Sequence, residues 1–348
     1  MEGQHHVLSF PSLALCRLHV QSPRMRFAPI ACLLLAAAGF AQTPASPEVT
    51  LKPVEGAVEV QIRGKTVAAY LTANDVSTPA RANETYKPYL RIVDPATGQA
   101  ITKGPGGKYP HHRGIFFGWM RIGFEQQKLD LWSMGSGRQV HTAFKEQSAA
   151  NGRAKLVSLI NWNDKKGLLI LSEERTMELS PMATPGFLRV DFLTTVKAEA
   201  GDLQLEADPE HGGVHYRAPQ EVDASKTDYF FPVAKPLPHK DLDYPWVGMN
   251  YTLGEKSYGV VQIDAPTNPR GTKWSAYRDY ARFGAYPRAT LKKGETLSLK
   301  YRFLISQGAI VSTELIQAEQ AAFTGVKPEA VTVTPLKAEV TAAPKAKK

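Results

Sequence analysis

The strongest constraint on the fold is the alternation of apolar and polar residues along much of the chain. Residues 58–62 show this pattern, and residues 297–305 repeat it over a longer stretch. A period of two is typical of strands with one buried face, whereas a helix repeats its apolar residues every three or four positions. Turn signals such as Asn151-Gly152 separate neighbouring segments at the spacing of antiparallel hairpins. The sequence therefore predicts an all-β, antiparallel protein.

The alternating region is not interrupted by a linker, which favours one large domain. We expect residues 42–325 to form a single antiparallel β-sandwich, most like the galactose-mutarotase supersandwich in length and strand density, with a jelly roll as the alternative. One helix is expected near the C-terminal end, with Ser312 as its N-cap, Phe323 on its apolar face and Gly325 at its end. Residues 326–348 lack a strand or helix pattern and are expected to form a flexible basic tail.

The first 41 residues have the features of a signal peptide. Arg26 precedes the apolar run 30–38, which is too short to span a bilayer, and Ala41 supplies a small residue at the cleavage position. The stretch before Met25 is unlike an ordinary n-region, which suggests an over-extended start and favours Met25 over Met1 as the first residue. We therefore expect an extracytoplasmic protein, either periplasmic or secreted, that lacks residues 1–41.

Removal of this segment excludes several classes of site. Cys16 and Cys32 both lie within it, so the mature chain has neither disulfides nor thiolate metal ligands. No later segment is long and apolar enough for a membrane span. The chain has a net charge of +9, and part of it lies in the leader and in the lysine-rich tail. The central domain is therefore only mildly basic. We therefore expect no nucleic-acid partner.

The densest group of chemically active side chains is the segment Tyr-Pro-His-His-Arg at residues 109–113. If the chain is already extended at His111, then His111, Arg113 and Trp119 share one face and His112 points the other way. At most one of the two histidines would then face a given pocket. The alternative is that one histidine belongs to the core and that Arg113 is a structural ion-pair partner.

A second group occupies residues 208–217, where paired glycines allow the backbone to approach a ligand or another strand closely. His211 and His215 have a spacing found in metalloprotease helices, but Pro209 and the glycines disfavour a helix. In a strand the two histidines would lie about 13 Å apart, so they would not hold one ion together unless the chain turned between them. The alternative is a glycine hairpin with exposed histidines.

Further polar and aromatic residues lie elsewhere in the chain. Asp130 and Trp132 belong to an Asp-Leu-Trp sequence, and His141 ends a Gly-Arg-Gln-Val-His sequence. Asn268 lies in a polar loop that precedes Trp274. The tryptophans could stack on sugar rings, or they could be core aromatics, which is the commoner fate of this residue in a large sandwich.

Together these motifs resemble the DUF6807 family, whose members are often labelled PmoA after a methane oxygenase. The resemblance spans about residues 58–308 and rests on Pro-His-His-Arg-Gly, Asp-Leu-Trp, Gly-Arg-Gln-Val-His, Glu-His-Gly-Gly-Val-His-Tyr-Arg and Pro-Thr-Asn-Pro followed by a tryptophan. It implies a secreted bacterial β-sandwich protein linked to carbohydrate breakdown. Tyr109 departs from the family's acidic lead-in to this first motif. We do not expect an oxygenase, because a particulate methane oxygenase subunit is built of membrane spans.

From these residues and this resemblance we predict a carbohydrate-active protein with a small-molecule carbohydrate substrate. The first hypothesis is an enzyme that acts on a sugar or sugar-derived substrate by histidine and carboxylate acid-base chemistry. The alternatives are a non-catalytic carbohydrate-binding protein and a metal-dependent enzyme with histidine and carboxylate ligands, for which a divalent metal is the one cofactor considered.

The residues predicted to carry these functions are expected to converge on one pocket, because a sandwich brings together side chains from strands distant in sequence. The predicted catalytic residues are His111, His112, Arg113, His141, Glu210 and His211. The predicted substrate-binding residues are Trp119, Asp130, His215, Arg217, Asn268 and Trp274.

Overall fold

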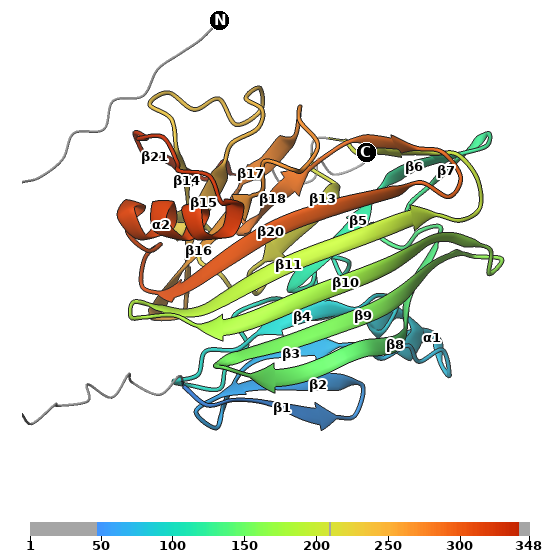
Figure 1. The fold of residues 1–348 in the computed structure, drawn as a ribbon, viewed down its shortest axis with the longest axis horizontal. Coiled ribbons are helices and arrows are strands. Elements are labelled where there is room, and N and C mark those ends of the chain that lie inside the picture. The colour runs from blue at the N-terminus through green and yellow to red at the C-terminus, as the bar shows by residue number, and fades with distance from the viewer. Residues whose placement is uncertain (1–46, 209, 341–348) are drawn as a thin grey trace, which may run out of the picture. The chain divides into compact units, whose positions relative to one another are not determined.

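The computed structural model describes residues 47–208 and 210–340. The predicted leader and its cleavage position lie outside these residues. Most of the described chain forms three antiparallel sheets (Figure 1), as the alternating pattern predicted. No helix in the described ranges is long and apolar enough to cross a membrane.

The first sheet has eight strands and contains the segments that the motifs pointed to. In spatial order its strands are β1 (Val49–Val54), β2 (Ala57–Ile62), β3 (Lys65–Leu71), β4 (Tyr89–Ile92), β5 (Ile115–Trp119), β13 (Gly212–Arg217), β18 (Arg282–Tyr286) and β17 (Lys273–Arg278). Strands β5 and β13 are distant in sequence but adjacent in the sheet, where Val214 lies opposite Phe117. The two histidine motifs therefore precede neighbouring strands.

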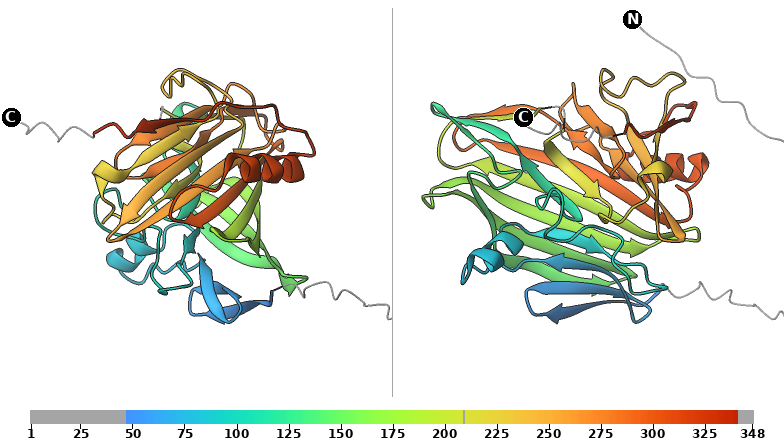
Figure 2. Two further views of the ribbon diagram at one scale, coloured as in Figure 1. Left: turned by 90° about the vertical axis from the view of Figure 1, so that its left-hand side faces the viewer. Right: turned by 180° about the vertical axis from the view of Figure 1, so that it is seen from behind.

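The second sheet has nine strands and includes the longest ones. In spatial order they are β21 (Thr334–Lys337), β14 (Asp228–Phe231), β15 (Trp246–Leu253), β16 (Lys256–Asp264), β20 (Thr296–Gln307), β11 (Gly186–Ala198), β10 (Leu169–Pro181), β9 (Arg153–Asp164) and β8 (Gly137–Ala150). A third, four-stranded sheet consists of β19 (Ala289–Leu291), β12 (Leu203–Glu206), β6 (Arg121–Phe124) and β7 (Gln127–Leu129). Figure 2 shows the long strands of the second sheet stacked against the first.

The main hydrophobic core lies between the two large sheets. Phe117 from β5 packs edge-on against Trp162 from β9, with ring centroids 5.2 Å apart, and also contacts Phe192 from β11. Trp119 packs against the same Trp162 ring and is fully buried. Burial of such large aromatic groups is the main force that holds the sheets together.

The predicted C-terminal helix is confirmed as α2 (Thr313–Thr324). The Ser312 hydroxyl accepts a hydrogen bond from the Leu315 amide, and Gly325 ends the helix in a left-handed conformation. Ile316 joins a second, smaller core on the outer face of the second sheet, together with Trp246 from β15. Two short helices that were not predicted, α1 (Pro79–Glu84) and the 3₁₀ helix η1 (Ala224–Lys226), lie in connections between strands.

The C-terminal segment differs from the predicted flexible tail. Strand β21 pairs with β14, and beyond it the amides of Ala338 and Glu339 donate to the backbone carbonyls of Thr227 and Tyr277. This part of the prediction was wrong: besides these backbone bonds, Leu336 and Ala338 pack against the main core and Lys337 pairs with Asp228, and so short a segment gives only a weak pattern in the sequence. Residues 341–348 lie outside the described ranges.

Candidate functional site

The histidine motifs meet on the face of the first sheet that is turned away from the main core. On this face Phe116 of β5 lies directly opposite His215 of β13. The indole of Trp132 covers both side chains, with its ring centroid 4.7 Å from each of theirs. Trp132 also makes edge contacts with His112 and His211, both at 6.1 Å. The tryptophan therefore forms the floor of a histidine cluster.

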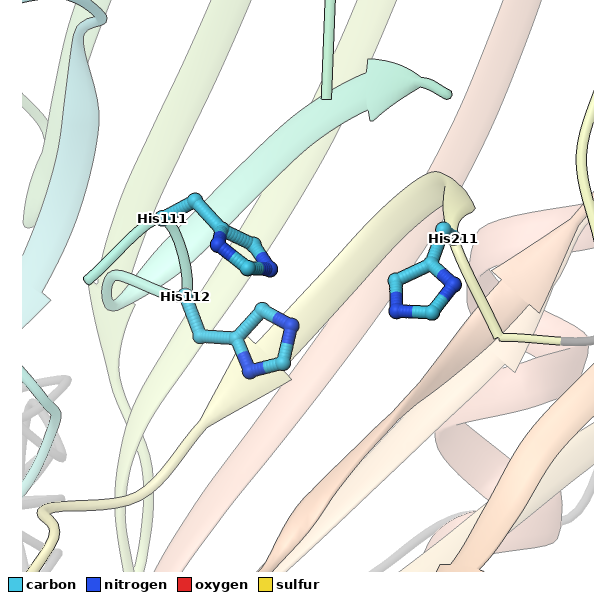
Figure 3. A group of neighbouring side chains, drawn as sticks. All are labelled: His111, His112 and His211. Atoms are coloured by element: carbon cyan, nitrogen blue, oxygen red, sulfur yellow. The ribbon is translucent and has the colours of Figure 1, made fainter. Parts of the chain in front are cut away.

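Three histidines form this cluster: His111, His112 and His211 (Figure 3). The rings of His111 and His112 are 4.3 Å apart, and each lies 6.4 Å from the ring of His211. One nitrogen from each ring lies within 4.8 Å of the others. Figure 3 shows that His111 and His112 come from the turn before β5, whereas His211 comes from the segment that leads into β13.

The prediction that only one of the paired histidines could face a given pocket is wrong. It assumed an extended chain at His111, but β5 begins only at Ile115. The preceding residues form a turn in which the His112 amide donates to the Tyr109 carbonyl and Gly114 has a φ of 52°. Gly114 is required here because a Cβ atom would lie 2.1 Å from the Leu90 carbonyl oxygen. Both imidazoles therefore reach the same side of the sheet.

Arg113 holds this turn in place. Its three guanidinium nitrogens donate to the carbonyl oxygens of Pro110, Glu84 and Asn83 at 2.9, 2.7 and 2.5 Å. The guanidinium also stacks on the Tyr86 ring, 4.0 Å from its centroid. With its donors used by the backbone, Arg113 is a positioning residue for the histidines and not an anion-binding group.

Burial keeps the imidazoles of His111 and His112 in their neutral form. Burial, followed by the charge of Lys87, lowers the pKa of His111 to about 3. Burial and then the charge of Arg282 lower the pKa of His112 well below its ordinary value. Among the described residues, His111 Nε2 and both ring nitrogens of His112 are buried without a hydrogen-bond partner. A buried polar atom without a partner is costly, so a ligand at these nitrogens would be favoured.

Asp208 orients the third histidine. Its Oδ1 atom lies 2.6 Å from His211 Nδ1 and also accepts a hydrogen bond from the Glu210 amide. Burial raises the pKa of Asp208, but the hydrogen bond and charge of His211 outweigh this effect and lower the pKa to about 2. An ionised Asp208 at Nδ1 leaves His211 Nε2 as the nitrogen available to a ligand.

Lys87 lies beneath the cluster and was not predicted from the sequence. Its Nζ atom donates to the Trp132 carbonyl at 2.7 Å and lies 4.4 Å from the centroid of the Phe116 ring. Burial, and then the charge of Arg113, lower the pKa of Lys87 well below its usual range. A single lysine between Tyr86 and Pro88 gave no signal that could have identified it.

Asp130 shapes the loop that carries the Trp132 floor. Its carboxylate accepts hydrogen bonds from the amides of Trp132 and Ser133 and from the Ser133 hydroxyl. In return, the Ser136 hydroxyl accepts from the Asp130 amide. Asp130, which was predicted to bind substrate, therefore holds the loop that positions Trp132.

Glu210 lies next to the cluster but is bound by two arginines. Its carboxylate pairs with Arg278 and, at 3.1 Å, with Arg282 Nη2. Burial raises the pKa of Glu210, and the hydrogen bond from Arg278 and the charge of Arg282 more than compensate, so that the pKa is lowered. Glu210 is therefore an ionised partner of the arginines and is poorly suited to donate a proton.

Other predicted site residues lie apart from the three histidines. His141 packs against Tyr70 and Phe144, with Nδ1 2.7 Å from the Ser158 hydroxyl, and the cluster found among the described residues does not include it. His215 Nε2 lies 2.8 Å from the Gly212 carbonyl. This arrangement agrees with the expectation that His211 and His215 would not hold one ion together.

The remaining predictions concern two tryptophans and an asparagine. Trp119 and Trp274 are buried in the main core, so neither presents a ring face to a sugar. Asn268 is also buried, and its amide donates to Asp264 and to the Lys300 carbonyl, which closes the loop after β16. These three side chains are used by the fold.

A hollow of about 550 Å³ lies beside the cluster. Its lining includes His111, Pro110 and Ser133, together with Tyr86 and residues 105–107. A volume of this size is within the range of small-molecule sites. The cluster is therefore accessible to a small substrate from the side of His111.

Comparisons with known proteins place the chain in a family and show distant structural likenesses. The family described as "Family of unknown function (DUF6807)" matches residues 57–320. No curated protein matches significantly. A β-arabinopyranosidase has a TM-score of 0.37 at 10% identity, over 75% of this chain and 40% of that chain. A heparan sulfate lyase from Pedobacter heparinus has a TM-score of 0.36 at 9% identity, over 76% and 36%.

A galactose mutarotase-like protein from Lactobacillus casei has a TM-score of 0.35 at 8% identity, over 75% of this chain and 100% of that chain. The chain thus spans less than half of the first two proteins and the full length of the third. With TM-scores below 0.5, these likenesses do not assign an activity to the chain. The antiparallel sandwich itself, which was predicted from the alternating pattern, is confirmed by the sheets described above.

Proposed function

Because this chain belongs to the DUF6807 family, whose function is unknown, we propose a function from the site itself. The protein is a metal-dependent enzyme in which His111, His112 and His211 bind a divalent transition metal. The observation that carries this proposal is the gathering of three ring nitrogens within 4.8 Å of one another. Imidazole is a preferred ligand of zinc and of several other transition metals.

The second shell supports the same assignment. The contact between Asp208 Oδ1 and His211 Nδ1, at 2.6 Å, is the carboxylate–histidine arrangement that orients metal-binding imidazoles. Zn–N bonds of about 2.0–2.1 Å place tetrahedral ligands about 3.3 Å apart. A bound metal would therefore draw the three rings slightly closer together. The neutral imidazoles of His111 and His112 supply lone pairs for such bonds.

Two alternatives receive less support from the structure. A non-catalytic carbohydrate-binding protein needs exposed aromatic rings for stacking, but Trp119 and Trp274 are buried in the core. Metal-free acid-base chemistry needs a group that can donate a proton near neutral pH. Glu210 is held by two arginines, and the three histidines lie close enough together to bind one ion.

Three protein ligands leave a coordination position open, which is typical of catalytic zinc sites. A metal bound there would supply an activated water or polarise a substrate oxygen. The hollow beside His111 would admit the substrate, and the buried Trp132 floor would exclude water from beneath. The sugar or sugar-derived substrate is expected from the family resemblance, and it forms a separate part of the proposal with its own test.

Metal titration tests the proposal directly. The protein is dialysed free of metal and titrated with Zn²⁺ in competition with a chromophoric chelator. The wild type should bind one ion tightly, and His111→Ala, His112→Ala and His211→Ala should each lose this binding. His239→Gln is the matched control, because His239 is half-exposed and pairs with Glu339 outside the cluster. The control should bind like the wild type.

Activity is then screened on glycosides, keto-sugars and lactones with metal-loaded and metal-free protein. Metal-dependent turnover that His211→Gln abolishes would support the full proposal. The metal part is wrong if the wild type binds no stoichiometric ion or if the His211 variants bind as well as the wild type. The sugar part is wrong if a metal-loaded protein turns over none of these substrates.

A further inference from the structure

Two buried arginines face each other beside the cluster. Arg217 of β13 lies directly opposite Arg282 of β18, and both side chains have an exposure of 1% or less. Like charges opposite each other on neighbouring strands destabilise a sheet. Arg282 shares the Glu210 carboxylate with Arg278 and also donates to the Ser275 hydroxyl at 3.0 Å. Arg217 has no such compensation.

The guanidinium of Arg217 has no acceptor among the described residues. Its Nε and Nη1 atoms are buried without a hydrogen-bond partner, and no described carboxylate forms an ion pair with it. Its guanidinium carbon lies 4.9 Å from the centroid of the Tyr280 ring, and Tyr229 and Tyr109 are also close enough to act on its charge. Burial lowers the pKa of Arg217 to about 10, so the group remains charged at neutral pH.

A buried charge without a partner is among the most costly features that a fold can contain. The other fully buried arginines have acceptors: Arg113 bonds to carbonyl oxygens, Arg175 bonds to Glu173, and Arg282, whose Nε also has no partner, is paired with Glu210. The free donors of Arg217 therefore need an explanation other than the stability of the fold. An oxyanion is the ligand that guanidinium groups bind best.

The position of Arg217 connects it to the histidine cluster. The Tyr280 ring, on which Arg217 stacks, also stacks on His112, with centroids 6.0 Å apart. A second hollow of about 260 Å³ is lined by Lys103 and Glu221, and by Pro219 and Gln220, which follow Arg217 closely in the chain. This hollow shares Pro105, Gly106 and Gly107 with the hollow beside His111. The two hollows are thus neighbouring parts of one surface.

We propose that Arg217 binds an oxyanion group of the substrate, so that the substrate of the histidine site is an acidic molecule such as a sugar acid. This inference rests on the proposed function, because it names the substrate class of the same site. Lys103 adds positive charge nearby, and its own amide donates to the Arg217 carbonyl at 3.0 Å. A guanidinium group would also bind free inorganic phosphate or sulfate. The experiment therefore compares a sugar acid with these inorganic anions.

The test measures the melting temperature at constant ionic strength with D-glucuronate, D-glucose, inorganic phosphate or sulfate. We expect glucuronate to raise the Tm of the wild type by about 2 °C or more, and neutral glucose to have no such effect. Arg217→Gln and Arg217→Lys should weaken or lose this response. Arg153→Gln removes an exposed arginine of β9 that pairs with Glu178, and it should respond like the wild type.

A second readout separates binding from a structural role. Without added anions, Arg217→Gln should melt at the same temperature as the wild type or higher, because it removes an unpaired buried charge. Its zinc affinity in the chelator assay should stay within a few-fold of the wild type. A structural arginine would instead lose stability when truncated. The comparison of glucuronate with glucose on the wild type needs no variant, so the proposal stays testable if the variants misfold.

The outcomes distinguish this inference from the metal proposal. Each anion is tested on dialysed, metal-free protein and on zinc-loaded protein. An Arg217-dependent response to glucuronate without any zinc binding would retain the anion site and refute the metal centre. Tight zinc binding with no difference between glucuronate and glucose would overturn the inference. A response to phosphate or sulfate alone would also overturn it, because it would identify an inorganic anion as the ligand.

Discussion

The contact between Asp208 and His211 allows the proposed metal centre to be tested at a single residue. Asp208→Asn keeps the acceptor for the Glu210 amide but removes the negative charge at His211 Nδ1, so the imidazole should become a poorer ligand and lose its fixed orientation. We expect zinc affinity to fall about 10–100-fold while the stoichiometry stays at one ion. Competition with a chromophoric chelator measures both quantities.

Asp202→Asn is the matched control, since Asp202 is an exposed aspartate that pairs with Lys292. It should bind zinc like the wild type. An Asp208→Asn protein with unchanged zinc affinity would show that this carboxylate does not support a metal ligand.

Asp264 gives a pH-dependent prediction away from the cluster. Burial raises its pKa to about 7, although the Asn268 hydrogen bond and the charge of Arg270 act in the opposite direction and Asp243 adds to the rise. The folded state therefore keeps the proton to higher pH than the unfolded state, whose aspartates titrate near 3.9. The wild type should lose stability relative to Asp264→Asn as the pH rises from about 4 to about 7, with no further change above that range.

Urea unfolding of both proteins at pH 4 and pH 8 measures this difference. The asparagine variant keeps an acceptor for Asn268, so the two stabilities should approach each other at low pH. Between pH 4 and pH 8, the free energy of unfolding of the variant should rise by about 2–4 kcal/mol relative to that of the wild type. A constant difference between the two proteins across this range would mean that Asp264 titrates normally.

Several individual residues of the site could be predicted from the sequence. The dense His-His and Glu-His motifs pointed to His111, His112 and His211, because several chemically active side chains stand together in each motif. His141 stood in a similar motif, but its ring packs against Tyr70 and Phe144. Side-chain direction depends on register and turns, which residue types do not determine. Lys87 was missed for the same reason, since only the fold brings it beneath Trp132.

At the scale of elements, the entry into β13 depends on Gly213. Its φ is 79°, and a Cβ atom would lie 2.0 Å from the Ala285 carbonyl oxygen of β18. Gly213→Ala should therefore force β13 and β18 apart and displace His211. Gly254→Ala is the matched control, because Gly254 also has a positive φ, of 62°, but open space around it. The control isolates the backbone strain from the steric clash.

We expect Gly254→Ala to cost about 1–2 kcal/mol, which is the usual penalty for a left-handed residue with a side chain. Gly213→Ala should cost at least about 1 kcal/mol more, because it adds a clash with backbone that cannot move freely. Denaturant midpoints measure both values. Equal costs for the two substitutions would contradict the close approach of β13 and β18.

The elements were predictable to different degrees. The long half-buried strands and helix α2 have strong periodic patterns, so the alternating residues and the Ser312 and Gly325 signals identified them. The turn before β5 was misjudged because its shape depends on Gly114 and on the bonds of Arg113 to distant carbonyls. Strand β21 was missed because it is short, with only Leu336 packed on the core, and because its partner β14 is distant in sequence.

At the scale of the whole molecule, the sandwich explains how the site is assembled. Strands β5 and β13 are separated by about a third of the sandwich in sequence but pair directly, so two motifs become one cluster. The fold class follows from the alternating pattern, whereas strand order does not, because many topologies share one pattern. The convergence of the motifs was therefore a hypothesis until the sheet order was known.

The leader gives a further prediction for the whole chain. From the Arg26-led apolar run and Ala41 we propose export followed by cleavage after Ala41. Expression of the full reading frame in a bacterial host should give an extracytoplasmic product whose intact mass corresponds to a chain that begins at Gln42. A membrane-bound product that retains Met25 to Ala41 would make this segment an anchor instead.

The most direct test of the metal centre is a crystal structure of the zinc-loaded protein with anomalous diffraction collected at the zinc edge. We expect one strong peak about 2.0–2.1 Å from a ring nitrogen of each of His111, His112 and His211, with Asp208 still bonded to His211 Nδ1. The absence of a peak among these three rings, or zinc bound only elsewhere on the molecule, would contradict the account.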